Sequence, residues 1–251
     1  MAALDLNCDL GEDPASRALD AALLAWVSSA NVACGGHAGD EGSMRTLARL
    51  CLERGVALGA HPSYPDRAGF GRRPMALGPS QLEAEVFEQL QALAACARAE
   101  GTWLAHVKPH GALYHDSARS PEVALALARA VQGVSPRLVL VGQAGSPALA
   151  LWRSMGLSVA AEAFADRRYA QDGRLVPRTQ PDALLTDPEQ AAAQAVELAH
   201  GRLRVEGVEL SVRADTLCLH GDTPGALAIA RAVRERLDLE HVLVRAPGPV
   251  S

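Results

Sequence analysis

Lysine is almost absent from this chain of 251 residues. Arginine occurs 23 times, whereas lysine occurs once, at Lys108. A general preference for arginine explains the 23 arginines but not the exception. A guanidinium group cannot give up its proton, whereas an amine has a pKa that burial and neighbouring charges can tune. Lys108 is therefore a candidate functional residue.

The chain also lacks paired cysteines and a targeting segment. None of its five cysteines forms a CxxC pair, and the number is odd. No disulfide framework is visible, so reduced thiols in a cytoplasmic protein are the expectation. The N-terminal residues MAALDLNCDLGED contain neither a basic region nor an apolar core, so we expect no signal peptide.

Long apolar runs, basic stripes and phosphate-binding glycine motifs are missing as well. Charges interrupt every apolar stretch before the roughly 20 residues that a membrane span requires. The net charge is −5, and no basic stripe or aromatic platform for bases is visible. The segment GGHAGDEG matches neither GxGxxG nor the P-loop pattern. We therefore expect no nucleic-acid partner and no membrane association, and we expect a small-molecule substrate.

Short apolar runs alternate seven times with amphipathic helical stretches. The predicted strands are Ala3–Cys8, Ala30–Cys34, Val56–Ala60, Trp103–Val107, Leu138–Val141, Leu157–Ala163 and Thr216–Leu219. The predicted helices are Ser16–Val27, Glu41–Arg54, Pro79–Ala99, Pro121–Gln132, Ser146–Met155, Pro188–Ala199 and Pro224–Leu237. Such alternation predicts an α/β fold with a parallel sheet, and its regularity favours a closed barrel. We expect residues 1–251 to form a single domain.

Two segments fall outside this repetition. Leu203–Val205 and Val208–Val212 are joined by Glu206 and Gly207, which predicts a small hairpin insertion near residues 202–212. The segment His241–Arg245 is expected to be an eighth strand or a cover for the barrel.

Polar residues gather at the carboxyl ends of the predicted strands, where a β/α barrel keeps its active site. Asp5, Asn7 and Asp9 share one face of the first strand because side chains alternate with a period of two. Asp5 and His106 lie inside apolar runs, and a buried charge requires a partner or a metal. We therefore expect residues far apart in the chain to meet at one mouth.

Three chemistries fit this set of residues. Asp9, His61 and His110 could hold a divalent metal that activates water. Carboxylates and histidines could instead perform general acid–base catalysis without a metal. Lys108 could act as a base, as a Schiff-base nucleophile or as a cation that binds a carboxylate. Arginines in the strand-end loops, such as Arg72 and Arg167, indicate a pocket that accepts anions.

Seven strings along the chain carry a resemblance to a known family. They are LNCDLGE at 6–12, ANVACGGHAGD at 30–40, GAHPSYPDRAGFGRR at 59–73, VKPHGALYH at 107–115, EAFADRRY at 162–169, LVPR at 175–178 and LHGD at 219–222. Their order and extent closely resemble the A-subunit family of 5-oxoprolinase, also called LamB/YcsF-like. That family is similar to the glycoside hydrolase/deacetylase superfamily, which implies a distorted seven-stranded β/α barrel. One departure is that the aromatic expected before His37 and the proline expected after Asp40 are absent.

The resemblance implies ATP-dependent opening of the lactam ring of 5-oxo-L-proline (pyroglutamate) to L-glutamate, with ATP hydrolysed to ADP and phosphate. It also implies two partner subunits, B and C, and an ATP site that could lie in this chain, on a partner or between them. The Asp/His/His metal set of the superfamily maps onto Asp9, His61 and His110.

The residue types and the resemblance together assign roles. The expected catalytic residues are Asp9, His37, Lys108, His110 and Asp222. The expected substrate-binding residues are Asn7, Glu12, Asn31, Asp40, His61, Arg72, Glu162, Arg167 and His220. Lys108 would neutralise the substrate carboxylate or an oxyanion, and Asp222 or His37 would move the proton.

Two other functions stay open. The chain could be a stand-alone metal-dependent deacetylase or amide hydrolase, which would act on acetylated substrates without ATP. It could also be a non-catalytic scaffold within the complex, in which case alanine substitutions at the strand ends would leave the activity of the complex intact.

Overall fold

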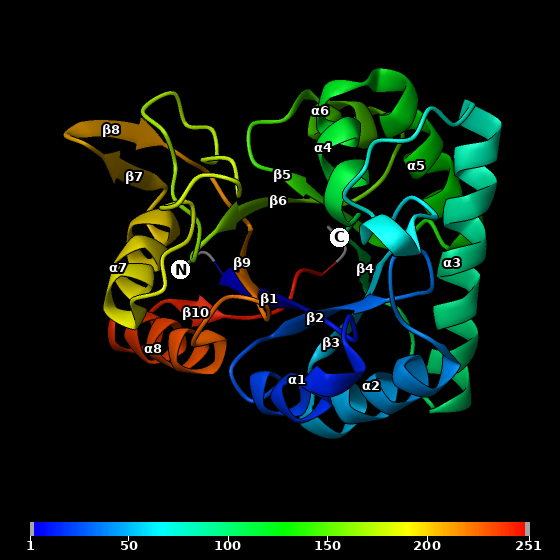
Figure 1. The fold of residues 1–251 in the computed structure, drawn as a ribbon, viewed down its shortest axis with the longest axis horizontal. Helices are drawn as coiled ribbons and strands as arrows, with labels where there is room; N and C mark the ends of the chain where they lie inside the picture. Colours follow the sequence, from blue (N-terminus) through cyan, green and yellow to red (C-terminus); the bar gives the residue numbers. More distant parts are fainter. Residues whose placement is uncertain (1–2, 249–251) are drawn as a thin grey trace.

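A computed structural model describes residues 3–248 and contains a closed barrel of seven parallel strands with helices outside (Figure 1). The barrel strands are β1 (Ala3–Leu10), β2 (Ser29–Ala33), β3 (Ala57–His61), β4 (His106–Val107), β5 (Val139–Gln143), β6 (Val159–Phe164) and β9 (Thr216–His220). They follow one another in that order, and β9 closes the ring by pairing with β1. The predicted seven-stranded β/α barrel is confirmed.

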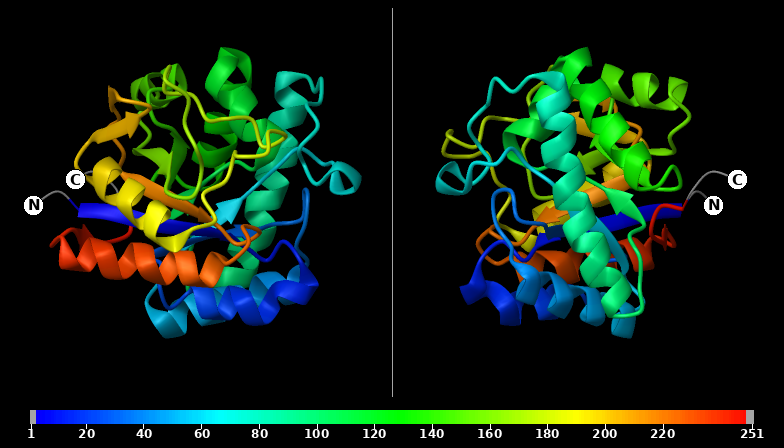
Figure 2. Two further views of the ribbon diagram at one scale, coloured as in Figure 1. Left: turned by 60° about the vertical axis from the view of Figure 1, so that its left-hand side comes forward. Right: turned by 90° about the vertical axis from the view of Figure 1, so that its right-hand side faces the viewer.

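Helices cover the outside of the barrel, as two further views show (Figure 2). They are α1 (Arg17–Leu23), α2 (Glu41–Arg54), α3 (Pro79–Ala99), α4 (Gly111–Arg119), α5 (Pro121–Val134), α6 (Pro147–Ser154), α7 (Pro188–Ala199) and α8 (Ala226–Leu239). Short 3-10 helices, η1 (Pro14–Ser16) and η2 (Arg67–Gly69), lie in two of the loops. No helix within residues 3–248 is long and apolar enough to cross a membrane.

The helices with the clearest end signals begin and end as predicted. At the start of α2 the Asp40 side chain accepts a hydrogen bond from the Ser43 amide, and the Ser43 hydroxyl lies 2.9 Å from the Asp40 amide nitrogen. This reciprocal capping satisfies amide groups that have no partner inside the helix. Gly55 ends α2 in the left-handed conformation that glycine adopts without strain.

The largest difference from the predictions is α4, which the sequence analysis missed. Pro109 and Gly111 indicate a loop, and they flank His110, the residue that precedes the helix. The start of the helix is supported by a distant loop, because the Ala112 amide donates to the Gly71 carbonyl. A side chain on Gly111 would collide with that same carbonyl, so the close approach requires glycine.

Two predicted elements are also shorter in the structure than the sequence predicts. The predicted strand 103–107 is reduced to the two residues of β4, and Trp103, which lies outside it, is 77% exposed. The predicted helix 16–27 ends at Leu23 in α1.

The two outlying segments take up strand structure. Strands β7 (Arg202–Val205) and β8 (Val208–Ser211) pair in an antiparallel hairpin, which projects beside α7 in Figure 1. Strand β10 (Leu243–Val244) runs parallel to the start of β1, so the tail adds a short eighth strand. The single-domain organisation stays a prediction.

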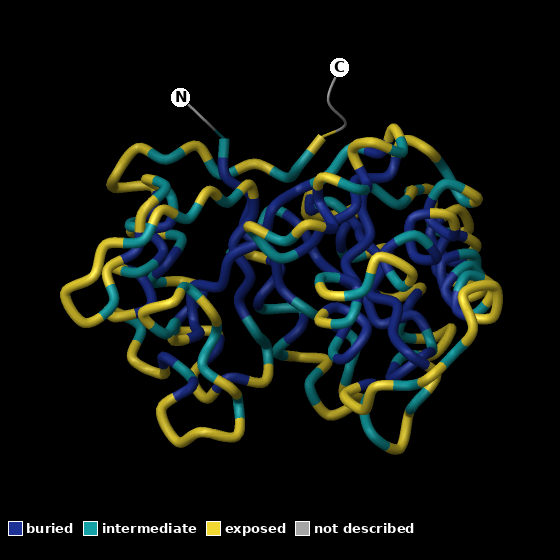
Figure 3. Tube along the Cα trace, turned by 90° about the horizontal axis from the view of Figure 1, so that it is seen from above, coloured by how far each residue is buried: buried dark blue, intermediate teal, exposed yellow. Residues whose placement is uncertain are grey.

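Most of the strand residues of the barrel are buried (Figure 3), and buried polar side chains fill its interior. Asn7 donates to Glu162 at 3.1 Å and to Thr216 at 2.6 Å. Asn31 donates to Asn7 at 2.8 Å, and its own side-chain oxygen lies 2.8 Å from Nε2 of His106. The hydrogen bonds offset the loss of water around these groups.

Apolar residues of the opposite parity face the helices. On β1, Leu6, Cys8 and Leu10 belong to the hydrophobic core, whereas the residues between them face the polar interior. The expected alternation along the first strand is therefore present, and it places carboxylates inside the barrel.

Asp5 lies at the amino end of this interior. Its carboxylate accepts hydrogen bonds from Ser28 at 2.7 Å, Ser29 at 2.8 Å and Thr216 at 2.6 Å. Burial nevertheless raises the pKa of Asp5 to about 6, and the negative charge of Glu162 acts in the same direction.

Replacing Asp5 with asparagine tests this raised pKa. The unfolded chain releases the proton near pH 3.8 and the folded chain near pH 6. The stabilisation that the raised pKa of Asp5 contributes to the folded chain is therefore fully present below pH 3.8 and is lost as the pH rises through 6. We expect the free energy of unfolding of Asp5→Asn, relative to wild type, to rise by up to about 3 kcal/mol between about pH 4 and pH 7.5.

Urea unfolding at the two pH values measures this change. The control is Asp238→Asn on α8, since Asp238 is exposed and pairs with Arg234. An Asp5→Asn difference that is the same at both pH values would contradict the raised pKa.

Candidate active site

One pocket of about 460 Å³ opens at the carboxyl ends of the barrel strands. It brings together residues from β1 to β9 that are far apart in the chain. The charged and histidine side chains in its lining include Asp9, Glu12, His61, Arg72, Lys108, His110, Arg167, Arg178, His220 and Asp222. The expected common mouth therefore exists, and its volume suits a small-molecule ligand.

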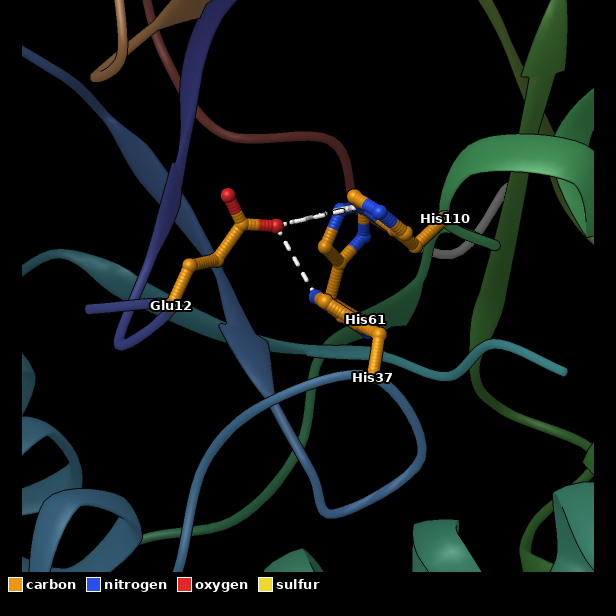
Figure 4. A group of neighbouring side chains, drawn as sticks. All are labelled: Glu12, His37, His61 and His110. Carbon is orange, nitrogen blue, oxygen red and sulfur yellow. Dashed lines mark hydrogen bonds and ion pairs between the residues drawn. The ribbon is translucent and has the colours of Figure 1, made fainter. Parts of the chain in front are cut away.

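Three histidines converge on Glu12 at one side of this mouth (Figure 4). The Glu12 Oε1 atom lies 2.9 Å from Nε2 of His37, 3.1 Å from Nδ1 of His110 and 3.8 Å from Nε2 of His61. The rings of His37 and His110 are stacked with centroids 3.7 Å apart. We call these four residues the Glu12 cluster.

Backbone carbonyls fix the protonation of two of these rings. Nδ1 of His61 lies 2.8 Å from the Lys108 carbonyl oxygen, and Nε2 of His110 lies 3.0 Å from the Phe70 carbonyl oxygen. A carbonyl oxygen only accepts hydrogen bonds, so each of these nitrogens carries its proton. In the neutral rings, the remaining nitrogens of His61 and His110 then face each other at 3.0 Å as two acceptors.

Such an arrangement requires a cation between the acceptors, either a proton or a metal ion. Burial opposes a charge on His61, but the neighbouring Asp9 raises the pKa of His61 above its ordinary value. Burial lowers the pKa of His110, and it lowers the pKa of His37 to about 4. In the absence of a metal, one proton on His61 shared with His110 resolves the conflict.

The Glu12 cluster also fits a divalent metal. Each member offers one ligand atom, and these atoms lie within 4.8 Å of one another. Three imidazoles and one carboxylate form a donor set that suits zinc and similar transition metals. Burial would raise the pKa of Glu12, but the neighbouring His110, His37 and His61 hold it well below its usual range, so the carboxylate stays ionised.

The predicted ligand set shares His61 and His110 with this cluster but names Asp9 as the carboxylate. Oδ2 of Asp9 lies 3.4 Å from Nε2 of His61, and its Oδ1 is held by Lys108 at 2.9 Å. Glu12 is closer to more of the histidines, so it is the better carboxylate ligand, and the role of Asp9 stays a prediction.

Lys108 lies on the floor of the pocket between two carboxylates. Its Nζ atom is 2.9 Å from Asp9 Oδ1, 2.9 Å from Glu162 Oε1 and 3.0 Å from Cys218 Sγ. Burial would lower the pKa of Lys108, but Asp9 and its other neighbours raise it well above the ordinary value. The ammonium therefore stays charged, which favours a fixed cation over a base or Schiff-base nucleophile.

His220 is oriented by Asp166, a residue that the predicted site did not include. Nδ1 of His220 lies 2.8 Å from Asp166 Oδ1, and Thr223 and the His220 amide also donate to Asp166. The ring stacks on Phe164 at 5.6 Å. A carboxylate that holds one imidazole nitrogen leaves the other available for proton transfer, so His220 is a candidate general acid–base.

Asp222 connects two arginines across the rim. Its Oδ2 atom accepts from Arg178 at 2.9 Å and from Arg72 at 3.1 Å. Burial would raise the pKa of Asp222, but Arg178 holds it below the usual range. These contacts favour a bracing role, and the expected catalytic role of Asp222 stays a prediction.

Not every predicted residue reaches the pocket. Asn7, Asn31 and Glu162 lie in the barrel interior, where Asn7 contacts both of the others. Asp40 is exposed at the start of α2, where it caps the helix. It lines a separate pocket with Glu12 and His37.

Other residues in the pocket lining were not predicted from the sequence. Tyr114 lies on the unpredicted helix α4, and Arg178 lies in a segment without helix or strand. Only the string LVPR at 175–178 indicated Arg178 in the sequence.

The chain matches the LamB/YcsF family over residues 4–250. It is similar to the 5-oxoprolinase A subunit of Chloroflexus aggregans, with 51% identity over 98% of this chain and 100% of that protein. It is also similar to the crystal structure of a lactam utilization protein from Thermus thermophilus, with 46% identity, a TM-score of 0.90, and coverage of 98% and 100%. A family 4 carbohydrate esterase from Streptomyces lividans shares the fold, with 14% identity, a TM-score of 0.51, and coverage of 99% and 98%.

Metal binding by the full chain tests the Glu12 cluster. We expect the chain to bind one Zn²⁺ ion and to release protons as the histidine nitrogens become ligands. His110→Ala should weaken binding at least about tenfold, because it removes one ligand. Isothermal titration calorimetry in buffers of different ionisation enthalpy measures both effects.

The matched control is His200→Ala, since His200 is exposed at the end of α7. A wild-type chain that binds no zinc, or a His110→Ala variant that binds it as tightly as wild type, would remove the cluster as a metal site.

Proposed function

The chain belongs to the LamB/YcsF family, and from that premise we propose that it is the A subunit of an ATP-dependent 5-oxoprolinase. The observation that carries the proposal is 51% identity, over the full length, to a protein named as the A subunit of 5-oxoprolinase. The structure related at 46% identity is named a lactam utilization protein, and 5-oxoproline is a lactam. The substrate would be 5-oxo-L-proline and the product L-glutamate.

The reaction breaks the bond between the carbonyl carbon and the ring nitrogen. The oxygen of a water molecule joins the carbonyl carbon, and the released nitrogen gains a proton. A five-membered lactam is a stable amide, so activation of its carbonyl oxygen helps, and coupling to hydrolysis of ATP to ADP and phosphate would supply it. We propose that ATP binds in this chain or at a site shared with partner subunits B and C.

The pocket holds groups suited to proton transfer and to activation of the carbonyl. The Nε2 atom of His220 is positioned by Asp166 to take a proton from water and return it to the leaving nitrogen. The ammonium of Lys108, whose charge is already matched by Asp9 and Glu162, would hold the Asp9 carboxylate in place beside His61. The Glu12 cluster would hold a divalent metal, which when bound would polarise the carbonyl or activate water.

The Glu12 cluster also favours a second candidate function. A buried donor set of histidines and a carboxylate could serve a stand-alone metal-dependent deacetylase or amide hydrolase. This candidate would act without ATP and without partner subunits. The scaffold alternative predicts that pocket substitutions leave the activity of the complex unchanged.

ATP-dependent formation of glutamate, measured with subunits B and C present, tests the proposed function. We expect His220→Gln to lower kcat at least about a hundredfold, because the variant cannot transfer the proton. The control His200→Gln, on the exposed end of α7, should keep the wild-type rate.

Two results would contradict the proposal. A wild-type complex that forms no glutamate, while the isolated chain with Zn²⁺ cleaves acetylated substrates, would favour the deacetylase. A His220→Gln complex with full activity would favour the scaffold.

A further inference from the structure

Arg167 is a buried cation in the pocket wall without an acidic partner among residues 3–248. It follows β6, lines the mouth and is 6% exposed. One of its terminal nitrogens, Nη2, donates to the Val176 carbonyl at 2.7 Å. Its Nε atom is buried without a hydrogen-bond partner in the described part of the chain.

The carboxylates near Arg167 form their hydrogen bonds and ion pairs with other residues. Asp166 is bound by His220 and Thr223, and Asp222 pairs with Arg72 and Arg178. A buried guanidinium without a directly paired carboxylate is costly, and the repulsion by Arg178 outweighs the attraction by Asp166. Lys108, by contrast, lies between two carboxylates. The unmatched charge of Arg167 therefore indicates an anion that arrives with a ligand.

The topology places Arg167 opposite the Glu12 cluster. Along the ring the order is β3, β4, β5, β6, so β6 is as far from β3 as a seven-stranded barrel allows. His61 ends β3, and Arg167 follows β6. The pocket between them includes the apolar groups of Phe164 and Leu175. A small ligand can therefore present an anionic group to one side and a reacting group to the other.

We propose that Arg167 binds the carboxylate of the substrate and thereby directs the lactam carbonyl towards the Glu12 cluster. The inference rests on the proposed function and assigns to Arg167 the carboxylate contact that the sequence predicts for Lys108. Lys108 already has its two carboxylate partners, so it has no charge left unmatched.

A carboxylate fits this position better than a phosphate group. One unpaired guanidinium matches one negative charge, and its planar N–H groups match the two oxygens of a carboxylate. A phosphate dianion would require a second free cation, but Asp222 already pairs with the neighbouring Arg72 and Arg178. The transferred phosphoryl group of ATP is therefore the less suitable occupant.

The affinities of the full chain for 5-oxoproline and for its carboxamide, 5-oxoprolinamide, test the assignment. The two compounds share the lactam ring and differ only in the side group, which is a carboxylate in one and a neutral carboxamide in the other. We expect wild type to bind 5-oxoproline at least about tenfold more tightly than the carboxamide, and Arg167→Gln to lose that preference. Arg167→Lys should keep part of it, because the charge remains.

The matched control is Arg168→Gln, since Arg168 is the exposed neighbour whose side chain lies near Gln190. The control should retain the wild-type preference for the carboxylate. Affinity for the carboxamide should be the same in wild type and Arg167→Gln, which a merely structural role of Arg167 would not produce.

Several results would overturn the inference. They are equal affinity of wild type for both compounds, no binding of either one, an unchanged preference in Arg167→Gln, and competition by inorganic phosphate but not by acetate. The binding assay uses neither ATP nor partner subunits. A complex that forms no glutamate would therefore overturn the proposed function, whereas loss of the preference in Arg167→Gln would still support Arg167 as the carboxylate site.

Discussion

The buried ammonium of Lys108 is the interaction on which the polar barrel interior depends. It reaches from β4 to carboxylates on β1 and β6 and so connects opposite walls of the barrel. The single positive charge of Lys108 faces two carboxylates, those of Asp9 and Glu162. These three groups on the floor of the pocket therefore carry an excess of negative charge. That excess explains why Asp9 favours a cation on the neighbouring His61. An arginine would not replace this lysine easily, because its larger planar group would have to fit the same narrow space.

The backbone of Lys108 also contributes to the site. Its carbonyl oxygen fixes the proton on Nδ1 of His61, just as the Phe70 carbonyl fixes the proton on Nε2 of His110. These two contacts turn the remaining nitrogens towards each other and towards Glu12. The affinity of the Glu12 cluster for a cation therefore follows from where two carbonyl groups point, and not only from the presence of histidines.

The sequence predicted the barrel and most of the converging side chains, because both depend on local patterns. Period-two alternation places Asp9 on the face of β1 that points into the barrel. Capping residues define both ends of α2. It did not predict α4, because the hydrogen bond from Ala112 to Gly71 that supports this helix joins segments far apart in the chain. The sequence likewise did not predict roles for Asp166 and Arg178. Their partners, His220 and Asp222, come from another strand-end loop that is distant in the chain.

The loop around Phe70 joins the rim of the pocket to its reactive side. Phe70 has a φ of 55°, a left-handed conformation that is unfavourable for a residue with a side chain and is retained where the surroundings enforce it. In this conformation its carbonyl oxygen orients His110, while Arg72, two residues later, pairs with Asp222. Asp222 also holds Arg178, which lies in the same segment as the partner carbonyl of Arg167. The orientation of His110 and the rim contact between Arg72 and Asp222 therefore both depend on the conformation of this loop.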